Sequence, residues 1–429
     1  MTRWSGPSAA LLLAAAVAGA QAQGLPPEIP DEPAPADTGT GSAAAPGRSS
    51  VVGRVELDEL AESPRYADHL DTQRLVGDLR TETRLAGAAT LRFSDRLELQ
   101  ARTVDDQQRA LNILRELYVS TPLPVAGCAA DLGRVNWKLG NALWYTPLDY
   151  FKRDAAVSSA AMTPASIREN RLGTLMLRGQ CGLGAGVVQA AFVPQVERRG
   201  SFDRAAFAPG FERTNPRSAL MLRASRTLSE SSTVEASALH RDGEGTTVGV
   251  GLSQLFGDAV VMGLDIANAP ALPDADGRVR ERRATRVALS LAWTLPFGPT
   301  LTFEKFHAQD AYSAGGWNQL RGDGHAAPPA DLIAYVQDRS SMQELATRNA
   351  YFAMANWLRA FDDPNFEALA AVGWNPVDHS RYLEAGATWH AGTSLSLQLL
   401  LERNQGAANT QYGLSRIKNA ATLSLMLHF

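Results

Sequence analysis

Three residues in one short segment, Ser237, His240 and Asp242, carry the groups of a nucleophile, a base and an acid. Nucleophilic catalysis needs these groups within hydrogen-bond reach of one another. The chain has no Gly-x-Ser-x-Gly elbow, no phosphate-binding glycine loop, and no His or Cys pair at zinc-site spacing. We therefore interpret His240 as an interface or loop histidine, and we expect no catalytic residue, no metal site and no cofactor.

The chain has two cysteines, Cys128 and Cys181. No histidine lies near either of them in the sequence, so neither has the neighbour that would activate a catalytic thiol. An even number of cysteines in an exported protein favours a disulfide. We predict this bond, which requires the two Cα atoms to lie within about 7 Å of each other; the alternative is two unpaired thiols.

The end of the sequence indicates which elements position these groups. Every second residue from 421 to 429 is apolar, and the residues between them are Thr, Ser, Met and His. A period of two predicts a strand with different surroundings on its two faces. This strand suits an outer-membrane β-barrel and resembles the C-terminal signal read by the barrel-assembly machinery, although a sandwich strand would alternate too. The signal residues are Leu423, Leu425, Leu427 and Phe429.

The start of the sequence indicates export. Arg3 precedes a short apolar run, and Ala20-Gln-Ala22 is a small-x-small cleavage site. We predict that residues 1–22 are a signal peptide, because the run is too short to span a bilayer. Residues 23–50 are rich in Pro, Ala, Gly, Ser and Asp, which predicts a disordered periplasmic tail. Residues 51–429 form the remaining domain, the barrel.

Alternating segments recur along the rest of the chain, clearly over 248–252, 287–293, 366–374, 383–389 and 395–399. Counted back from Phe429, short connections alternate with longer ones, as short periplasmic turns alternate with long extracellular loops in outer-membrane barrels. The count ends at residues 51–57 and predicts an all-β, antiparallel transmembrane barrel of about 18 strands (16–18). It places a turn at Ser94 and Asp95, and it places Cys128 and Cys181 in neighbouring periplasmic turns.

A barrel of this size encloses a water-filled lumen. If Val135, Trp137, Leu139, Leu175 and Leu177 face lipid, the residues between them face inward. The predicted pore-lining residues are Arg134, Asn136, Lys138, Arg178, Arg223, Glu235, Asp265, Glu304, Glu367, Glu384 and Glu402. Two interpretations remain open: the basic residues form a wall opposite an acidic one, or they neutralise acids across the lumen.

Residues 132–151 contain a spaced set of residues, namely Gly133, Arg134, Trp137, Gly140, Pro147 and Asp149. The segment resembles a pattern in proteobacterial outer-membrane porin-like barrels, the alginate-export-like and related uncharacterised porin-like families. It departs from that pattern because no Gly directly follows Trp137 and Thr146 replaces Asn before Pro147. The resemblance implies the barrel class and a loop, here 141–170, that dips into the pore; an exposed surface loop is the alternative.

Together these patterns predict a porin or substrate-selective channel of the bacterial outer membrane, for passive passage of small hydrophilic or anionic solutes. We expect membrane lipid, the barrel-assembly machinery and a small hydrophilic solute as partners. The net charge of -4 says little about partners, but the sequence has only short basic pieces such as residues 278–283, which argues against nucleic acid. The alternatives are an exporter component for a polysaccharide or small molecule, and an outer-membrane barrel enzyme or structural barrel.

Overall fold

The computed structural model describes residues 50–429, except 66–69, 86–87, 103–109, 158–163, 199–206, 280 and 323–327. The predicted signal peptide, residues 1–22, and residues 23–49 of the predicted tail lie outside the described residues. No helix among the described residues is long and apolar enough to cross a membrane.

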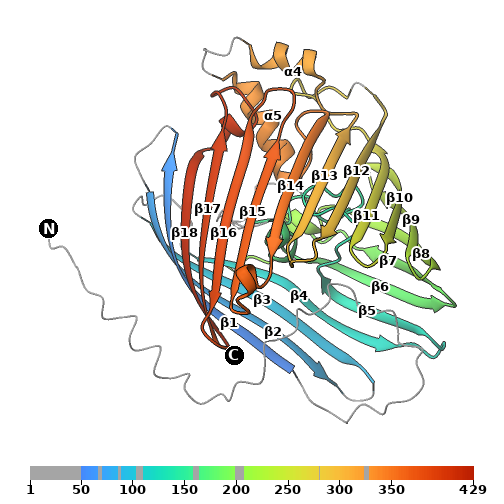
Figure 1. The fold of residues 1–429 in the computed structure, drawn as a ribbon. Helices are drawn as coiled ribbons and strands as arrows, with labels where there is room; N and C mark the ends of the chain where they lie inside the picture. The colour runs from blue at the N-terminus through green and yellow to red at the C-terminus, as the bar shows by residue number, and fades with distance from the viewer. Residues whose placement is uncertain are drawn as a thin grey trace.

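Eighteen strands form one closed antiparallel barrel, which confirms the predicted fold class and count (Figure 1). Each strand pairs with the next, and β1 also pairs with β18 to close the sheet. The strands are β1 (Ser50–Pro64), β2 (Leu70–Arg84), β3 (Thr90–Arg102), β4 (Ala110–Pro122), β5 (Cys128–Val135), β6 (Thr174–Leu183), β7 (Gly186–Val193), β8 (Ala219–Ser229), β9 (Ser232–Arg241), β10 (Gly245–Phe256), β11 (Val260–Pro270), β12 (Arg283–Thr294), β13 (Thr300–Ala308), β14 (Asn349–Trp357), β15 (Phe366–Trp374), β16 (Arg381–His390), β17 (Leu395–Gln405) and β18 (Ile417–His428).

The alternation predicted for the last strand is present in β18. Leu423 and Leu425 are exposed on the outer wall, whereas Thr422 and Ser424 are buried on the inner one. The backbone of Phe429 exchanges two hydrogen bonds with Gly53 of β1, N to O at 2.8 and 3.0 Å. The last residue of the sequence therefore takes part in closing the barrel.

The connections at the two ends of the barrel differ in length. We call the end that holds the start of β1 and the end of β18 the turn rim; seven of its eight connections have five residues or fewer, for example 184–185 and 230–231. At the other end, the loop rim, residues 136–173, 194–218 and 309–348 form long loops, although 242–244 is short. The helices lie in these loops: α2 (Pro164–Glu169), α3 (Phe211–Thr214), α4 (Ala314–Arg321) and α5 (Ala330–Ser341), the last two over one end of the barrel (Figure 1). Short 3-10 turns η1 (Ala360–Asp362) and η2 (Tyr412–Leu414) complete the set.

Two local predictions were wrong. Ser94 and Asp95 lie inside β3, where a β-bulge in the pairing with β4 shifts the register. Asp95 faces outward and accepts a hydrogen bond from Asn112 Nδ2 at 2.8 Å, so a polar residue that suggested a turn belongs to the wall. The first strand is also longer than predicted, because β1 extends to Pro64.

Cys128 and Cys181 lie in strands and not in turns. Cys128 begins β5, Cys181 lies in β6, and the two residues are direct partners across the strand pair with Cα atoms 4.1 Å apart. They form a disulfide. The turn-rim ends of β5 and β6, the two strands that are connected by the long loop 136–173, are therefore covalently joined.

Candidate functional site

The segment that follows β5 enters the lumen, and we call its described residues, 136–157 and 164–173, the inward loop. Val135, Trp137 and Leu139 are buried among inward side chains such as Met176 and Met221, so the prediction that they face lipid was wrong. The strand ends at Val135, and beyond that residue a period of two no longer separates lipid from lumen. The Trp137 ring stacks on Phe151 with centroids 5.7 Å apart, which gives the loop an apolar core inside the barrel.

Two predicted pore-lining acids attach the inward loop to the far wall. Asp265 of β11 accepts hydrogen bonds from Asn141 N at 2.7 Å and Asn141 Nδ2 at 2.6 Å. Glu304 of β13 accepts from Leu143 N at 2.5 Å and Trp144 N at 3.0 Å. Gly140 has a positive φ of 85°, and a Cβ there would lie 2.7 Å from Asp265 Oδ2. A loop that starts at β5 therefore crosses the interior of the barrel and is attached to β11 and β13. This crossing narrows the lumen.

A buried ion pair closes the inward loop on itself. Asp149 receives two hydrogen bonds from the Arg171 guanidinium, Nη1 at 2.8 Å and Nη2 at 3.1 Å. Arg171 Nε also donates to Asn136 Oδ1 at 2.7 Å, and Asn136 Nδ2 donates to the carbonyls of Arg168 and Glu169. Asn136 thus holds the loop together and does not project from a strand as predicted. Lys138, also predicted on a strand, lies in this loop and is partly buried.

The inward loop is joined to the long loop that carries α4 and α5. Glu344 forms an ion pair with Lys152 Nζ at 3.1 Å and accepts a hydrogen bond from the Tyr145 hydroxyl at 3.0 Å. Burial opposes ionisation of the Glu344 carboxyl, but Arg286 and Lys152 outweigh it and hold the pKa of Glu344 below its ordinary value. The inward loop, which narrows the lumen, is therefore linked to the long loop that carries α4 and α5. Both loops are fixed to the wall through the ion pair of Glu344 with Arg286 of β12.

The predicted inward arginines of β6 and β8 are paired with acids on adjacent strands. Arg178 binds Asp131 of β5 through Nε at 2.8 Å, and its guanidinium lies 5.1 Å from the centre of the Trp137 ring. Arg223 binds Glu235 of β9 through Nε at 2.9 Å and Gln189 at 2.9 Å. Arg178 and Arg223 are therefore neutralised by acids on neighbouring strands. These two arginines do not form a basic wall opposite an acidic one.

Arg134 does not lie where it was predicted. Its neighbours Gly133 and Val135 share the inner face of β5 with Asp131, so Arg134 has the opposite orientation. Its guanidinium donates to Gly173 O at 2.8 Å and Thr214 Oγ1 at 3.2 Å, and lies 5.0 Å from the centre of the Phe211 ring. Arg134 therefore anchors α3 at the loop rim and does not line the open lumen.

The remaining predicted acids occupy the inner faces of β15, β16 and β17. The Tyr382 hydroxyl donates to Glu384 and contacts Glu402 Oε1 at 2.9 Å, so these two carboxylates share one phenol. Glu367, near the turn rim, is more exposed and lies 3.2 Å from His390 Nε2. These three residues place acidic side chains on the inner faces of three neighbouring strands.

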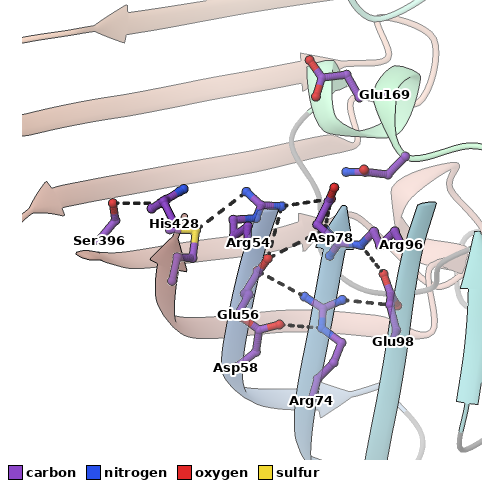
Figure 2. A network of polar contacts seen from close by, with 12 residues as sticks. Arg54, Glu56, Asp58, Arg74, Asp78, Arg96, Glu98, Glu169, Ser396 and His428 are labelled. Atoms are coloured by element: carbon purple, nitrogen blue, oxygen red, sulfur yellow. Dashed lines mark hydrogen bonds and ion pairs between the residues drawn. The ribbon is translucent and has the colours of Figure 1, made fainter. Parts of the chain in front are cut away.

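The largest charged cluster of the lumen was missed by the sequence analysis (Figure 2). Arg74 binds Asp58 through Nε at 2.6 Å and lies 3.7 Å from Glu98. Arg96 binds Glu98 at 2.8 Å and lies 3.7 Å from Asp78. The central part of this cluster, which we call the charge lattice, consists of Arg54, Arg74, Arg96 and Arg115 with Glu56, Asp58, Asp78 and Glu98 on β1 to β4, and Arg80 Nε lies 3.9 Å from Asp78 at its edge.

The charge lattice also supports the inward loop. Arg115 of β4 donates to Asp78 Oδ2 at 2.9 Å and to Asn170 Oδ1 at 2.9 Å. Its four arginines are matched in number by four acidic residues, so the lattice presents groups of both signs. A sequence signal existed: charged residues alternate with Leu or Val at 54–58 and 96–99, as expected for strands with one wet face.

The three residues that could have formed a catalytic triad do not assemble. Ser237 and His240 are three residues apart on β9, so their side chains point to opposite faces. Ser237 Oγ lies 2.8 Å from the Tyr150 hydroxyl inside the barrel, whereas His240, exposed on the other face, contacts Thr246 Oγ1 at 2.9 Å. The described residues contain no group of His, Cys, Asp and Glu arranged to hold a metal ion.

No protein-family model matches this sequence, and no curated protein matches it. Solved structures share its fold. OccK5 (OpdH) of Pseudomonas aeruginosa has a TM-score of 0.54 at 10% identity, covering 89% of this chain and 98% of that chain. OccAB4 of Acinetobacter baumannii gives 0.52 at 10% identity, covering 89% and 98%. The outer membrane protein OpdK of P. aeruginosa gives 0.50 at 8% identity, covering 89% and 99%.

These similarities define the class of the fold, an outer-membrane porin-like β-barrel. They do not support the more specific resemblance to alginate-export-like barrels, because no family model matches and the similar structures are Occ and Opd proteins. The motif residues behind that resemblance have local roles here: Gly140 gives Asp265 access to the loop, and Asp149 binds Arg171.

Proposed function

We propose that this protein is a channel of the bacterial outer membrane through which small hydrophilic solutes pass passively. The observation that carries the proposal is a closed barrel of 18 strands whose inner face bears ionisable side chains and whose lumen is narrowed by an inward loop. A wall with an apolar exterior and a charged interior separates lipid from water. A constriction fixed by hydrogen bonds limits the size of the solute.

Carboxylates are the solute class that we favour within this function. The lumen contains guanidinium groups on β2 to β4, β6 and β8, and arginine binds planar carboxylates through two parallel hydrogen bonds. These arginines already have neighbouring acids as partners, so a passing carboxylate competes with those acids for the guanidinium groups. A solved structure of the similar protein OpdK contains vanillate, itself an aromatic carboxylate.

We also propose that the last strand directs assembly. Leu423, Leu425, Leu427 and Phe429 lie on one side of β18, where membrane lipid and the assembly machinery have access to them. Cleavage after residue 22 and export to the outer membrane complete this proposal. Oriented by the lengths of its connections, the turn rim faces the periplasm and the loop rim faces outward.

Conductance across a planar lipid bilayer tests the channel function directly. We expect the refolded full-length protein to produce discrete current steps in a simple salt solution, and small carboxylates to reduce that current more than neutral sugars of the same size. A folded barrel that conducts no ions would overturn the channel. A barrel that conducts ions, but whose current is reduced equally by small carboxylates and by neutral sugars, would overturn only the carboxylate preference.

A further inference from the structure

The outer wall of the barrel contains a groove across β16, β17, β18 and β1, with a volume of about 440 Å³. Ala61, Ala385 and Ala421 form part of its lining, flanked by Leu383 and Leu401. These residues alternate with Glu62, Glu384 and Ala420, which have the inward orientation, so the groove opens on the outside. It arises because alanines replace the larger side chains that cover the wall nearby, such as Leu423 and Leu425.

A groove of this kind on a membrane-facing wall is filled by hydrocarbon, because lipid is the solvent there. Its lining is mainly apolar and suits an acyl chain. Acyl chains fit many apolar surfaces, so the identity of the lipid depends on the groups at the end of the groove that meets the headgroup layer.

Two arginines stand at the loop-rim end of the groove. Arg403 lines it directly, and Arg381 lies two residues from Leu383 on the same face of β16. Both side chains are exposed, and neither guanidinium group forms a hydrogen bond or ion pair with another described residue. The ring of Trp374, the register partner of Arg381, stacks on Tyr351 at 5.5 Å, an aromatic pair typical of the membrane interface.

The charges around the groove favour an anionic headgroup. The acids of β16 and β17, Glu384 and Glu402, face the lumen and bind Tyr382, so they do not compensate the outward arginines. The outward acids Glu59 and Asp71 lie on β1 and β2, beyond the alanine edge of the groove. Arginine binds phosphate through two parallel hydrogen bonds and is weakly hydrated, which suits an interfacial site.

We propose that this groove binds an anionic phosphate-bearing lipid of the membrane, with an acyl chain along the alanines and the phosphate on Arg381 and Arg403. The site depends on the barrel being in a bilayer and not on the solute that the lumen conducts. A lipid held there would cover the β1–β18 seam, at which the barrel closes, and would hold the loop rim at the level of the headgroups.

Native mass spectrometry of the full-length barrel in detergent tests the site. The probes are dioleoyl phosphatidylglycerol, which is anionic, and dioleoyl phosphatidylcholine, which has the same chains and no net charge. Arg381→Ala and Arg403→Ala each remove one charged contact, and Ala421→Leu fills the groove. Arg226→Ala, an exposed arginine on β8 near the turn rim, is the matched control.

We expect phosphatidylglycerol to bind more tightly than phosphatidylcholine, and each arginine substitution at the groove to weaken it about tenfold, as for loss of one charged hydrogen bond. Ala421→Leu should weaken both lipids, and Arg226→Ala neither. Equal binding of the two lipids, or unchanged phosphatidylglycerol binding in the Arg381→Ala/Arg403→Ala variant, would overturn the proposal. Dimers that disappear in Ala421→Leu without a change in lipid binding would also overturn it, because a second copy would then occupy the groove.

Discussion

Glu304 offers the sharpest test of how the constriction is held. Its two carboxylate oxygens accept the backbone N–H groups of Leu143 and Trp144, at 2.5 and 3.0 Å. These residues belong to a loop that begins at β5, eight strands away from β13 in the closed sheet. Glu304→Ala removes both acceptors and leaves a small side chain on the wall. The other contacts between the loop and the wall, such as those at Asp265, Arg115 and Ser237, remain in place.

The size of the effect follows from these two bonds. A hydrogen bond to a charged group contributes about 1.5–3 kcal/mol, and the lower value applies here because lumen water can replace the carboxylate. Loss of both lowers the free energy of local opening by about 3 kcal/mol. Hydrogen exchange at the amides of Leu143 and Trp144 then accelerates by about two orders of magnitude.

Hydrogen-exchange mass spectrometry of the folded barrel measures this change. Glu367→Ala is the control, because Glu367 also faces inward but contacts His390 and not the inward loop. Glu304→Gln should give an intermediate rate, since one oxygen remains as an acceptor. Exchange at Leu143 and Trp144 that stays at the wild-type rate in a folded Glu304→Ala barrel would refute the reasoning.

Two further predictions concern the barrel wall. Arg96→Met should destabilise the charge lattice by about 3–5 kcal/mol, because it leaves the buried Glu98 without its 2.8 Å partner. A lower temperature for loss of the heat-modifiable gel band measures this, with exposed Arg226→Met as control, and equal temperatures would contradict it. Deletion of Phe429 removes its two backbone hydrogen bonds to Gly53 and should reduce the yield of inserted barrel while conductance per channel stays unchanged. An unchanged yield would count against its role in assembly.

The sequence predicted the barrel because its wall obeys one simple rule. Strands with one lipid face and one wet face have a period of two, and β18 shows it from Ala421 to Leu427. The rule gave a wrong prediction where a local hydrogen bond places a polar residue on the outer face of a strand. Asp95 is polar on the outer face because it binds Asn112, so it was interpreted as a turn.

The site was harder to predict, because its partners are distant in the sequence. Asp265 and Glu304 accept hydrogen bonds from Asn141 and Leu143, and nothing local in the sequence indicates these partners. Arg134 was misplaced because the lipid face of β5 was assigned partly from Trp137 and Leu139, which lie beyond the end of the strand, and this inverted the alternation. Periodicity thus identifies the face of a strand, whereas the contents of the lumen depend on tertiary contacts.

Single-channel conductance in a planar bilayer, compared between the wild type and Asp265→Ala/Glu304→Ala, tests the central claim most directly. The double variant removes the wall acceptors of residues 141–144 and leaves the strands unaltered. Our account predicts discrete steps for the wild type and larger steps for the variant, because the inward loop no longer narrows the lumen. Folded barrels that conduct no current in either form, or steps of equal size in both, would contradict it.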